Sequence, residues 1–481
     1  MSNINPMDLA FFLLENSSRQ MHMTAFQMFK IPARQTHTFP AKLLRTYRDS
    51  KVAAPFNQKL KWLGKNVASW QKVKPDMNYH VRHVAVPAPG TDKQFYELIS
   101  FLNTPLLDRA LPPWECYIID GIEGNRCAVM IKVHHALIDG GAALKLFRNA
   151  MNDSPQDKSI RAIWMPSDKK SARTKRSKVS ESQVKKLLQG FSKLPANMLG
   201  AGNDIARMGA QALRFKPRES ALPFGAQKTL FNNIAQSSAR RYGNCEIPLA
   251  DVKAIAKTTE TTVNDVVTAI IDHALHQYLQ EHNSGISVPL VSLMAMSTRK
   301  PGQKATGNQV SAELVPMGEP AASVKERLQQ VHDSIQKIKD RSQKLPDSVR
   351  QFYSIFVFGS SALADFAPAF EAIPNANLVI SNMVGPQEQL YTGGVPIVAF
   401  QGLPIVPPGG GLNVTFASFN KNICLAVGSA PEAVNNPYEL IQLMQQSFTD
   451  LQKATNGTGK AKRKPQLKSK QNTSQKTRSK K

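Results

Sequence analysis

The stretch 128–143 constrains this chain most, because it joins a strand, a turn and a helix start around polar residues. Its first six residues are mostly β-branched or apolar, which is typical of a buried strand. His134 and His135 follow at the strand's end, Asp139 comes four residues after His135, and Gly140 permits a tight turn. An imidazole carried into a turn by a strand, with a carboxylate nearby, is suited to a general base held by its own loop.

The spacing alone is weak evidence, because paired histidines at a strand end are usually structural. The context strengthens it: a helical apolar pattern from 142 to 151 completes the strand, turn and helix that the chemistry requires. We therefore predict His135 as the general base. His134 is expected to order the loop.

Five further segments stand in a particular order around this string: Pro113-Trp114-Glu115, Asn264-Asp265, 307–311, 381–386 and 411–415. Together with His-His-x-x-x-Asp-Gly, they resemble the CoA-dependent acyltransferases of the chloramphenicol acetyltransferase-like superfamily. Within it, the chain most resembles the bacterial wax ester synthase/diacylglycerol acyltransferase family, from about Pro6 to Leu451. Trp114 is expected to pack near the catalytic loop rather than to take part in chemistry.

The resemblance implies an α/β fold with two similar chloramphenicol acetyltransferase-like lobes of mixed sheet and flanking helices, joined by a helical crossover linker. The boundaries expected are 1–152 for the N-terminal lobe, 153–236 for a basic, partly helical linker, 237–453 for the C-terminal lobe and 454–481 for a basic, disordered tail.

The resemblance also implies site residues in the second lobe. Asn264 and Asp265 are expected near the catalytic histidine, with Asn264 as a possible donor to the substrate or oxyanion. A helix cap at Thr262 or Asn264 is a sound alternative role for these polar residues. Arg299 resembles the superfamily arginine that pairs with the motif aspartate. A partly buried carboxylate is costly unless paired and a guanidinium offers bidentate geometry, so Asp139 and Arg299 are expected to hold the loop, with Gly140 supporting it.

The predicted reaction is direct acyl transfer in a ternary complex. His135 would take the proton of an alcohol as its oxygen attacks the thioester of a fatty acyl-CoA. No nucleophile motif such as Gly-x-Ser-x-Gly occurs, so no covalent acyl-enzyme is expected. The resemblance implies long-chain alcohols or diacylglycerol as acceptors, giving wax esters or triacylglycerol for storage. No cofactor or metal is expected, and acyl-CoA is a co-substrate.

The four cysteines lie far apart without Cys-x-x-Cys spacing, which argues against a zinc site or a disulfide framework and for a reducing compartment. No stretch reaches the ~18 apolar residues of a membrane span, and no signal peptide is expected.

The net charge of +26 is unevenly placed: residues 158–218 carry +12, residues 457–481 carry +10 and the rest only +4. Such clusters suit anionic surfaces. We expect a cytoplasmic protein, peripheral on the inner face of the membrane or on lipid inclusions, with no specific nucleic acid. Residues 184–215 have a helical apolar spacing that fits either an amphipathic membrane patch or a packed crossover helix.

Two alternatives remain open at the level of sequence. A condensation-domain-like acyl or peptidyl transferase shares the His-His-x-x-x-Asp-Gly string, although no carrier or adenylation module accompanies it. A non-catalytic basic protein that binds a lipid surface or nucleic acid would use the basic segments alone, although the tail lacks the interleaved aromatics of a nucleic-acid fold.

Overall fold

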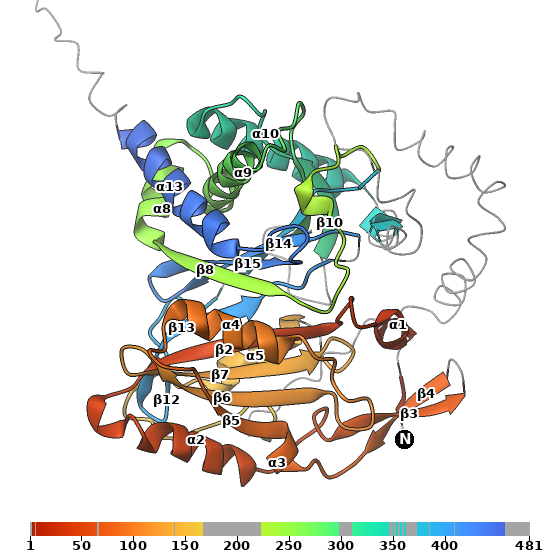
Figure 1. Cartoon of the computed structure of the whole chain (residues 1–481), viewed down its shortest axis with the longest axis vertical. Helices are drawn as coiled ribbons and strands as arrows, with labels where there is room; N and C mark the ends of the chain where they lie inside the picture. The colour runs from red at the N-terminus through yellow and green to blue at the C-terminus, as the bar shows by residue number, and fades with distance from the viewer. Residues whose placement is uncertain are drawn as a thin grey trace, which may run out of the picture.

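The computed structural model describes residues 2–4, 6–64, 67–138, 140–166, 223–297, 310–345, 373–383, 385–407 and 409–456, with the isolated positions 350, 353–354, 356–357 and 360–361. Two six-stranded mixed sheets lie one above the other in Figure 1, each with helices against it. The α/β fold with two sheet-based lobes is therefore confirmed.

The N-terminal lobe is built on a sheet with the strand order β12-β13-β2-β7-β6-β5. The strands are β12 (Tyr391–Thr392), β13 (Val395–Leu403), β2 (His22–Lys30), β7 (Arg126–His134), β6 (Trp114–Ile122) and β5 (Val81–Ala85). A smaller sheet beside it has the order β1-β4-β3: β1 (Ser2–Asn3), β4 (Val67–Lys72) and β3 (Gln58–Gly64). Residues 62–72 thus lie largely in the β3–β4 hairpin.

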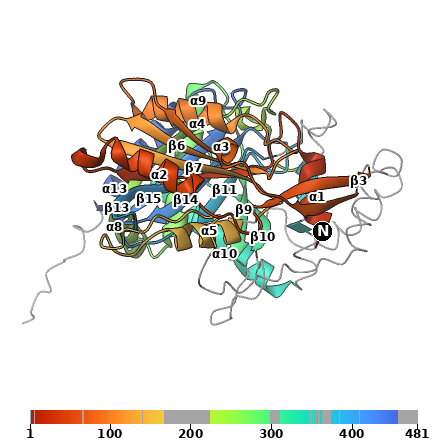
Figure 2. The same ribbon diagram turned by 90° about the horizontal axis from the view of Figure 1, so that it is seen from below.

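Strand β7 lies inside this sheet and is buried on both faces, which explains why its apolar run does not alternate with polar residues. Cys127, Val129 and Ile131 face the core that includes helix α2 (Thr38–Arg48). Ala128 and Met130 face the core that includes helix α4 (Asp92–Asn103). From below, α2 lies across the front of the lobe, while α1 (Pro6–Leu14) and β3 lie at one end (Figure 2). The remaining helices of this lobe are the short α3 (Met77–His80), the 3-10 turn η1 (Ala33–Gln35) and α5 (Gly140–Ala150).

The C-terminal half of the chain contributes two strands to the N-terminal sheet. Strand β13 pairs antiparallel with β2 along most of its length, and β12 pairs with β13. In Figure 1 the blue β12 lies among the red and orange elements of the lower lobe. The first lobe therefore contains residues 391–403, well beyond the segment expected to end it at residue 152.

The C-terminal lobe is built on a sheet with the order β10-β9-β11-β14-β15-β8. Its strands are β10 (Val310–Pro316), β9 (Val291–Ser297), β11 (Leu378–Met383), β14 (Leu412–Phe419), β15 (Asn422–Ser429) and β8 (Arg241–Pro248). The helices that the structure describes in full there are α8 (Leu249–Thr258), α9 (Val263–Glu281), α10 (Val324–Lys344), α13 (Pro437–Asn456) and the 3-10 turn η2 (Leu230–Asn232).

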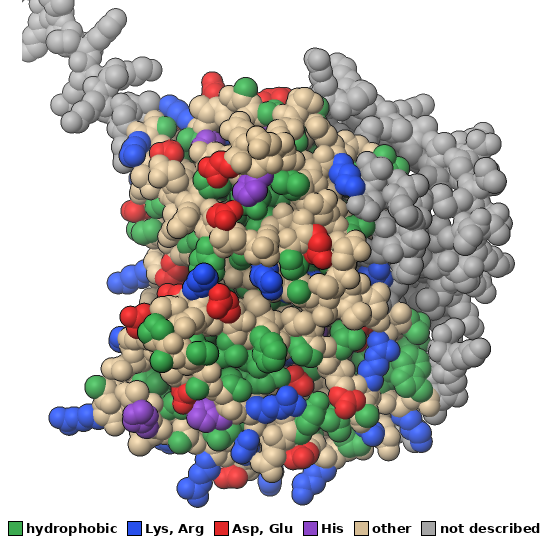
Figure 3. All heavy atoms as spheres, viewed as in Figure 1, with side chains coloured by type: hydrophobic (Ala, Val, Ile, Leu, Met, Phe, Trp, Pro, Cys, Tyr) green, Lys and Arg blue, Asp and Glu red, His purple; other side chains and the backbone are tan. Residues whose placement is uncertain are grey.

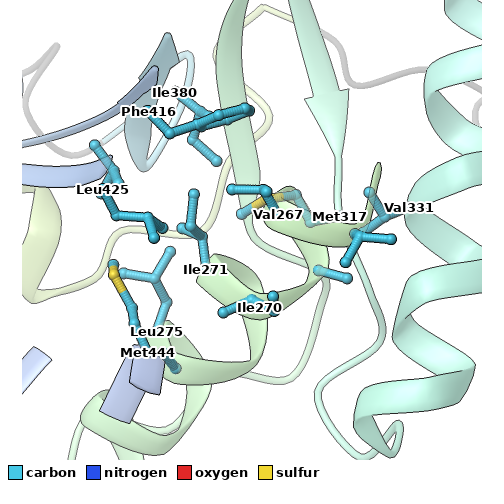
Figure 4. Packing of buried hydrophobic residues seen from close by; sticks show 14 of the residues in the cluster. Val267, Ile270, Ile271, Leu275, Met317, Val331, Ile380, Phe416, Leu425 and Met444 are labelled. Carbon is cyan, nitrogen blue, oxygen red and sulfur yellow. The ribbon is translucent and has the colours of Figure 1, made fainter. Parts of the chain in front are cut away.

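Helix α9 is the centre of the second core, because it packs against α8, α10 and α13 as well as the sheet. Figure 4 shows Val267, Ile271 and Leu275 of α9 beside Phe416 of β14 and Met444 of α13. The predicted cap is also present: Thr262 accepts a hydrogen bond from the backbone N–H of Asp265, which completes a capping box.

A polar seam joins the lobes. Asn103, at the end of α4, donates to the hydroxyl of Tyr242 in β8 at 2.6 Å. Gln20 donates to the carbonyls of Thr104 at 2.9 Å and Ser238 at 2.7 Å. The lobes therefore meet through directed hydrogen bonds, two of which come from Gln20, two residues before β2 begins.

The linker expected at 153–236 is described only at its ends. Residues 153–166 lie with the N-terminal lobe, where Trp164 is fully buried and stacks on Trp114 at 4.7 Å. Residues 223–236 lie with the C-terminal lobe, where Phe231 is buried in the second core. Residues 167–222 and the basic tail from 457 onward lie outside the described residues. Within the described part, no helix is long and apolar enough to cross a membrane.

Candidate active site

Strand β7 carries the two histidines to the end of the N-terminal sheet. His134 is the last residue of the strand, opposite His22 of β2, and its N–H donates to the carbonyl of Pro113 at 3.0 Å. The N–H of His135 donates to the carbonyl of Met21 at 2.8 Å. The backbone of both histidines is therefore fixed by neighbouring segments even where the sheet ladder ends.

The side chain of His134 is enclosed. Its residue is fully buried, and its ring stacks on Phe12 of α1 with a centroid separation of 3.9 Å and an interplanar angle of 6°. Nδ1 accepts a hydrogen bond from the N–H of Ala136 at 3.1 Å, so the ring proton of the neutral form lies on Nε2. Glu15 Oε1 lies 3.4 Å from that Nε2, and no described residue gives this nitrogen a better aligned partner. Both ring nitrogens thus face protein groups.

The side chain of His135 is half-buried and lies in the turn that follows β7. Its ring stacks against Phe11 of α1, with centroids 4.5 Å apart. The turn is closed by the N–H of Leu137, which donates to the carbonyl of His134 at 2.9 Å. Of the two histidines, His135 is the one that keeps access to the exterior.

Two of the predicted loop-holding residues lie outside the described residues, namely Asp139 and Arg299. Gly140, expected in the turn, is the first residue of helix α5, which begins two residues before the helical apolar spacing does. Trp114 is fully buried and donates from its indole to the carbonyl of Phe56 at 2.8 Å, which agrees with a packing role.

The structure adds Glu15 and Arg109, which the sequence did not single out. Glu15 is buried after the end of α1, and its Oε2 lies 3.2 Å from a guanidinium nitrogen of Arg109. We call Glu15, Arg109 and His134 the Glu15 cluster. Burial alone would raise the pKa of the Glu15 carboxyl, but His134, the Met21 N–H and Arg109 together hold this pKa below its usual range. The only signal for Glu15 in the sequence was an acid at the end of the helical apolar pattern 6–15.

A second buried ionisable side chain lies on the same face of the sheet as His134. Lys132, two residues before His134, is fully buried and donates to the carbonyls of Leu102 at 3.3 Å and of Pro105. Its Nζ lies 3.9 Å from Glu115 of β6. Burial lowers the pKa of Lys132 to about 8. This lysine holds the carboxyl-terminal end of α4, where the carbonyls of a helix favour a cation.

In the second lobe, the structure brings two predicted segments together. The side-chain oxygen of Asn264 accepts a hydrogen bond from Asn382 of β11 at 3.0 Å. Asp265 caps α9 and lies 2.6 Å from Nδ1 of His332 on α10, so its carboxylate is engaged in structure. Among the described residues, no group of three His, Cys, Asp or Glu side chains is placed to hold a metal ion.

Comparison with known proteins agrees with this organisation. The wax ester synthase/diacylglycerol acyltransferase catalytic domain matches residues 4–267, and the C-terminal domain of the same family matches residues 306–452. The chain is 52% identical, over 94% of its length and 97% of the relative's, to a Mycobacterium tuberculosis protein named probable diacylglycerol O-acyltransferase Tgs4. It is 31% identical to the O-acyltransferase WSD of Acinetobacter baylyi, over 87% of this chain and 90% of that one.

The fold has solved counterparts. The wax ester synthase/diacylglycerol acyltransferase of Marinobacter aquaeolei VT8 superposes with a TM-score of 0.74 at 23% identity, covering 95% of this chain and 100% of that one. A condensation domain of the CDA synthetase superposes less closely, with a TM-score of 0.54 at 12% identity, covering 94% of this chain and 96% of that one. From the domain matches, the two sequence relatives and the two-lobed fold, the chain belongs to the wax ester synthase/diacylglycerol acyltransferase family and is an O-acyltransferase.

Proposed function

We propose that this acyltransferase moves a long-chain fatty acyl group from acyl-CoA to a fatty alcohol or to diacylglycerol, with His135 as the general base. The observation that carries the assignment of the base is the contrast between the histidines. His134 is fully buried with both ring nitrogens facing protein groups, whereas His135 is half-buried in the turn. The relative named as a diacylglycerol O-acyltransferase and the family's description as wax ester synthase/diacylglycerol acyltransferase support the two classes of acceptor.

The reaction runs in one ternary complex. Neutral His135 takes the proton of the acceptor hydroxyl as its oxygen attacks the thioester carbonyl. The carbon–sulfur bond then breaks, and the departing CoA sulfur takes the proton back from the imidazolium, which restores the neutral base. A positioned base supplies about 10²–10⁴-fold, and the remainder comes from orientation and from donors to the oxyanion. Acyl-CoA is a co-substrate, and the step needs no cofactor.

A cysteine acyl-enzyme is disfavoured by the surroundings of the thiols. Cys116, Cys127, Cys245 and Cys424 are free and buried, and burial raises the pKa of each thiol, to about 12 for Cys245. A thiol that stays protonated is a poor nucleophile. Direct transfer to the alcohol is the simpler route.

Asn264 is the proposed oxyanion or substrate donor. Its side-chain oxygen is occupied by Asn382, which orients the amide so that its Nδ2 group is the end available to donate. Asp139 and Arg299 are proposed to hold the motif loop as a carboxylate–guanidinium pair, and Asp265 to fix the start of α9.

The protein is proposed to work as a peripheral protein on the inner face of the membrane or on lipid inclusions, held by its basic segments. On the face shown in Figure 3, Lys and Arg side chains are interspersed with Asp and Glu. Most of the charge excess belongs to residues 158–218 and 457–481. Binding to anionic vesicles should therefore weaken with salt and should weaken when residues 457–481 are removed.

The test follows CoA release by purified protein from palmitoyl-CoA with hexadecanol or dipalmitoylglycerol. Release with either acceptor supports the proposal and ranks the acceptors. No release with either, from folded protein on lipid vesicles, contradicts it and favours a binding protein that uses the basic segments alone.

A further inference from the structure

A carboxylate sits inside the protein beside the motif histidines. Glu15 follows α1 in the loop that leads to β2, and the side chain of this acid has no exposed surface. A carboxylate removed from water costs several kcal/mol unless it is paired and hydrogen-bonded. Because the chain keeps a buried carboxylate at this place, the groups that contact Glu15 indicate its role.

One carboxylate oxygen of Glu15 contacts groups that position both histidines. Oε1 accepts a hydrogen bond from the N–H of Met21 at 3.2 Å and lies 3.4 Å from Nε2 of His134. The carbonyl of Met21 in turn accepts the N–H of His135 at 2.8 Å. Glu15 is therefore in contact with the side chain of the first histidine and is one residue removed from the backbone of the second.

The other oxygen is held by Arg109. The guanidinium lies 3.2 Å from Oε2 and donates to the carbonyl of Phe12 at 2.9 Å, at the carboxyl-terminal end of α1. This end also carries Phe11 and Phe12, whose rings stack on His135 and His134 respectively. One ion pair thus fixes the acid and the helix end that supports both imidazoles.

The polarity of these contacts selects a tautomer. Because Nδ1 of His134 accepts the N–H of Ala136, a neutral ring must carry its proton on Nε2, which is the nitrogen that faces the carboxylate. A carboxylate can only accept, so it favours that tautomer. A primary amide in its place could turn its NH₂ toward Nε2 and favour a proton on Nδ1, which would then oppose the N–H of Ala136.

We propose that Glu15 is a positioning residue for the reaction: with Arg109 it fixes the tautomer and ring of His134, and through Met21 it fixes the backbone of His135. This inference rests on the proposed role of His135 as base. It gives the first half of the motif loop its own acid–arginine pair, distinct from the Asp139–Arg299 pair predicted from the sequence.

The test compares Glu15→Gln with the wild type and with Glu123→Gln, a matched control at an exposed acid in the β6–β7 turn. We expect kcat for CoA release to fall about 10²-fold in Glu15→Gln, the size of a small misplacement of a reacting group, with KM for acyl-CoA unchanged. We expect Glu123→Gln to match the wild type. In Arg109→Gln, kcat should fall less, because the guanidinium is 39% exposed and water partly replaces it.

A second readout does not depend on turnover. In protein labelled with ¹⁵N-histidine, the His134 ring should show the Nε2-protonated pattern in the wild type and in Glu123→Gln, and lose it in Glu15→Gln. If Glu15→Gln does not fold, Glu15→Asp, which keeps the charge but shortens the reach, replaces it in the kinetic measurement, with a fall in kcat again expected.

The outcomes separate the two proposals. An unchanged kcat in the Glu15 variant overturns the positioning role, whether or not the tautomer changes. A lowered kcat with the His134 tautomer retained overturns the tautomer mechanism. If the wild type releases no CoA with either acceptor, the proposed function fails, while the ¹⁵N pattern still decides whether Glu15 sets the tautomer.

Discussion

Each lobe contains a buried carboxylate that contacts one arginine and one histidine. In the N-terminal lobe this is the Glu15 cluster. In the C-terminal lobe, Asp272 of α9 lies 2.7 Å from Arg327 of α10 and 3.5 Å from His276, which we call the Asp272 cluster. The two share their chemistry, so their differences separate what such a cluster does for stability from what it does for a site.

The difference lies in what surrounds them. In the Asp272 cluster all three side chains are at least 94% buried, and the arginine also donates to the carbonyl of Gly318 at 3.1 Å, so the cluster ties two helices to a loop. In the Glu15 cluster the arginine is 39% exposed, and the histidine directly precedes the half-buried His135. A fully buried cluster stabilises the fold, whereas a cluster with one exposed side chain can also position a neighbouring reactive group.

The largest expected effect is on the rate. His135→Ala should lower kcat for CoA release by about 10²–10⁴-fold, the contribution of a positioned base, with little change in melting temperature. His276→Ala, in the Asp272 cluster, should lower the melting temperature and leave kcat of the folded protein unchanged. Equal loss of kcat in both variants would remove the functional distinction between the clusters.

The next effect is on stability. Arg327→Met leaves the Asp272 carboxylate buried without its cation, and breaking such a pair costs about 3–5 kcal/mol. Arg109→Met should cost less, because part of that guanidinium is already in water. Urea unfolding of both variants measures the loss in free energy of unfolding. A larger loss for Arg109→Met would contradict the assignment of the Asp272 cluster as the more stabilising of the two.

A smaller effect concerns acid pH. The pKa of Glu15 is lowered in the folded protein, so its contribution to the free energy of unfolding is present above the unfolded-state pKa and is lost as the pH falls through the folded-state value. Urea midpoints should therefore fall more steeply with acid in the wild type than in Glu15→Gln. Parallel curves from pH 6 to about pH 3 would mean that the carboxylate is not held by its partners.

The smallest effect concerns Lys132, the buried cation on the same sheet face as His134. Its pKa is about 8 in the folded protein and 10.5 ordinarily, so the unfolded chain binds more protons between these values and stability rises with pH there. Relative to Lys132→Met, the wild type should gain stability from about pH 8 to pH 10. A constant difference would show that this amine is solvated in the native state.

Much of the fold was predictable, because the hydrophobic spacing of each element reflects its own burial. The strand before the histidines and the helix after them were both predicted from the spacing of their apolar residues. The pairing of β13 with β2 was not, since periodicity predicts strands but not distant partners. That sheet joins residues almost 380 positions apart, such as Thr24 and Leu403.

Only the part of the site that lies within one short motif was predictable from the sequence. His134 and His135 stand together in the chain, whereas Glu15 and Arg109 are distant from each other and from the motif and meet only in the fold. Lys132 looked like an ordinary residue of an apolar strand, because nothing local distinguishes a buried lysine from one at a strand edge. Asp139 and Arg299 stay predictions.

The donation of β12 and β13 to the first sheet also sets the order of assembly during synthesis. Until residue 403 has left the ribosome, β2 is an unprotected edge strand with unpaired backbone groups, the kind of edge that invites pairing with another chain. Met21 and His22, which lie beside the candidate base, stand just before the part of β2 that pairs with β13, from Thr24 to Phe29. The sheet that carries the candidate base is therefore completed only after residue 403 has been made, which leaves a long interval in which chaperones have an exposed strand to protect.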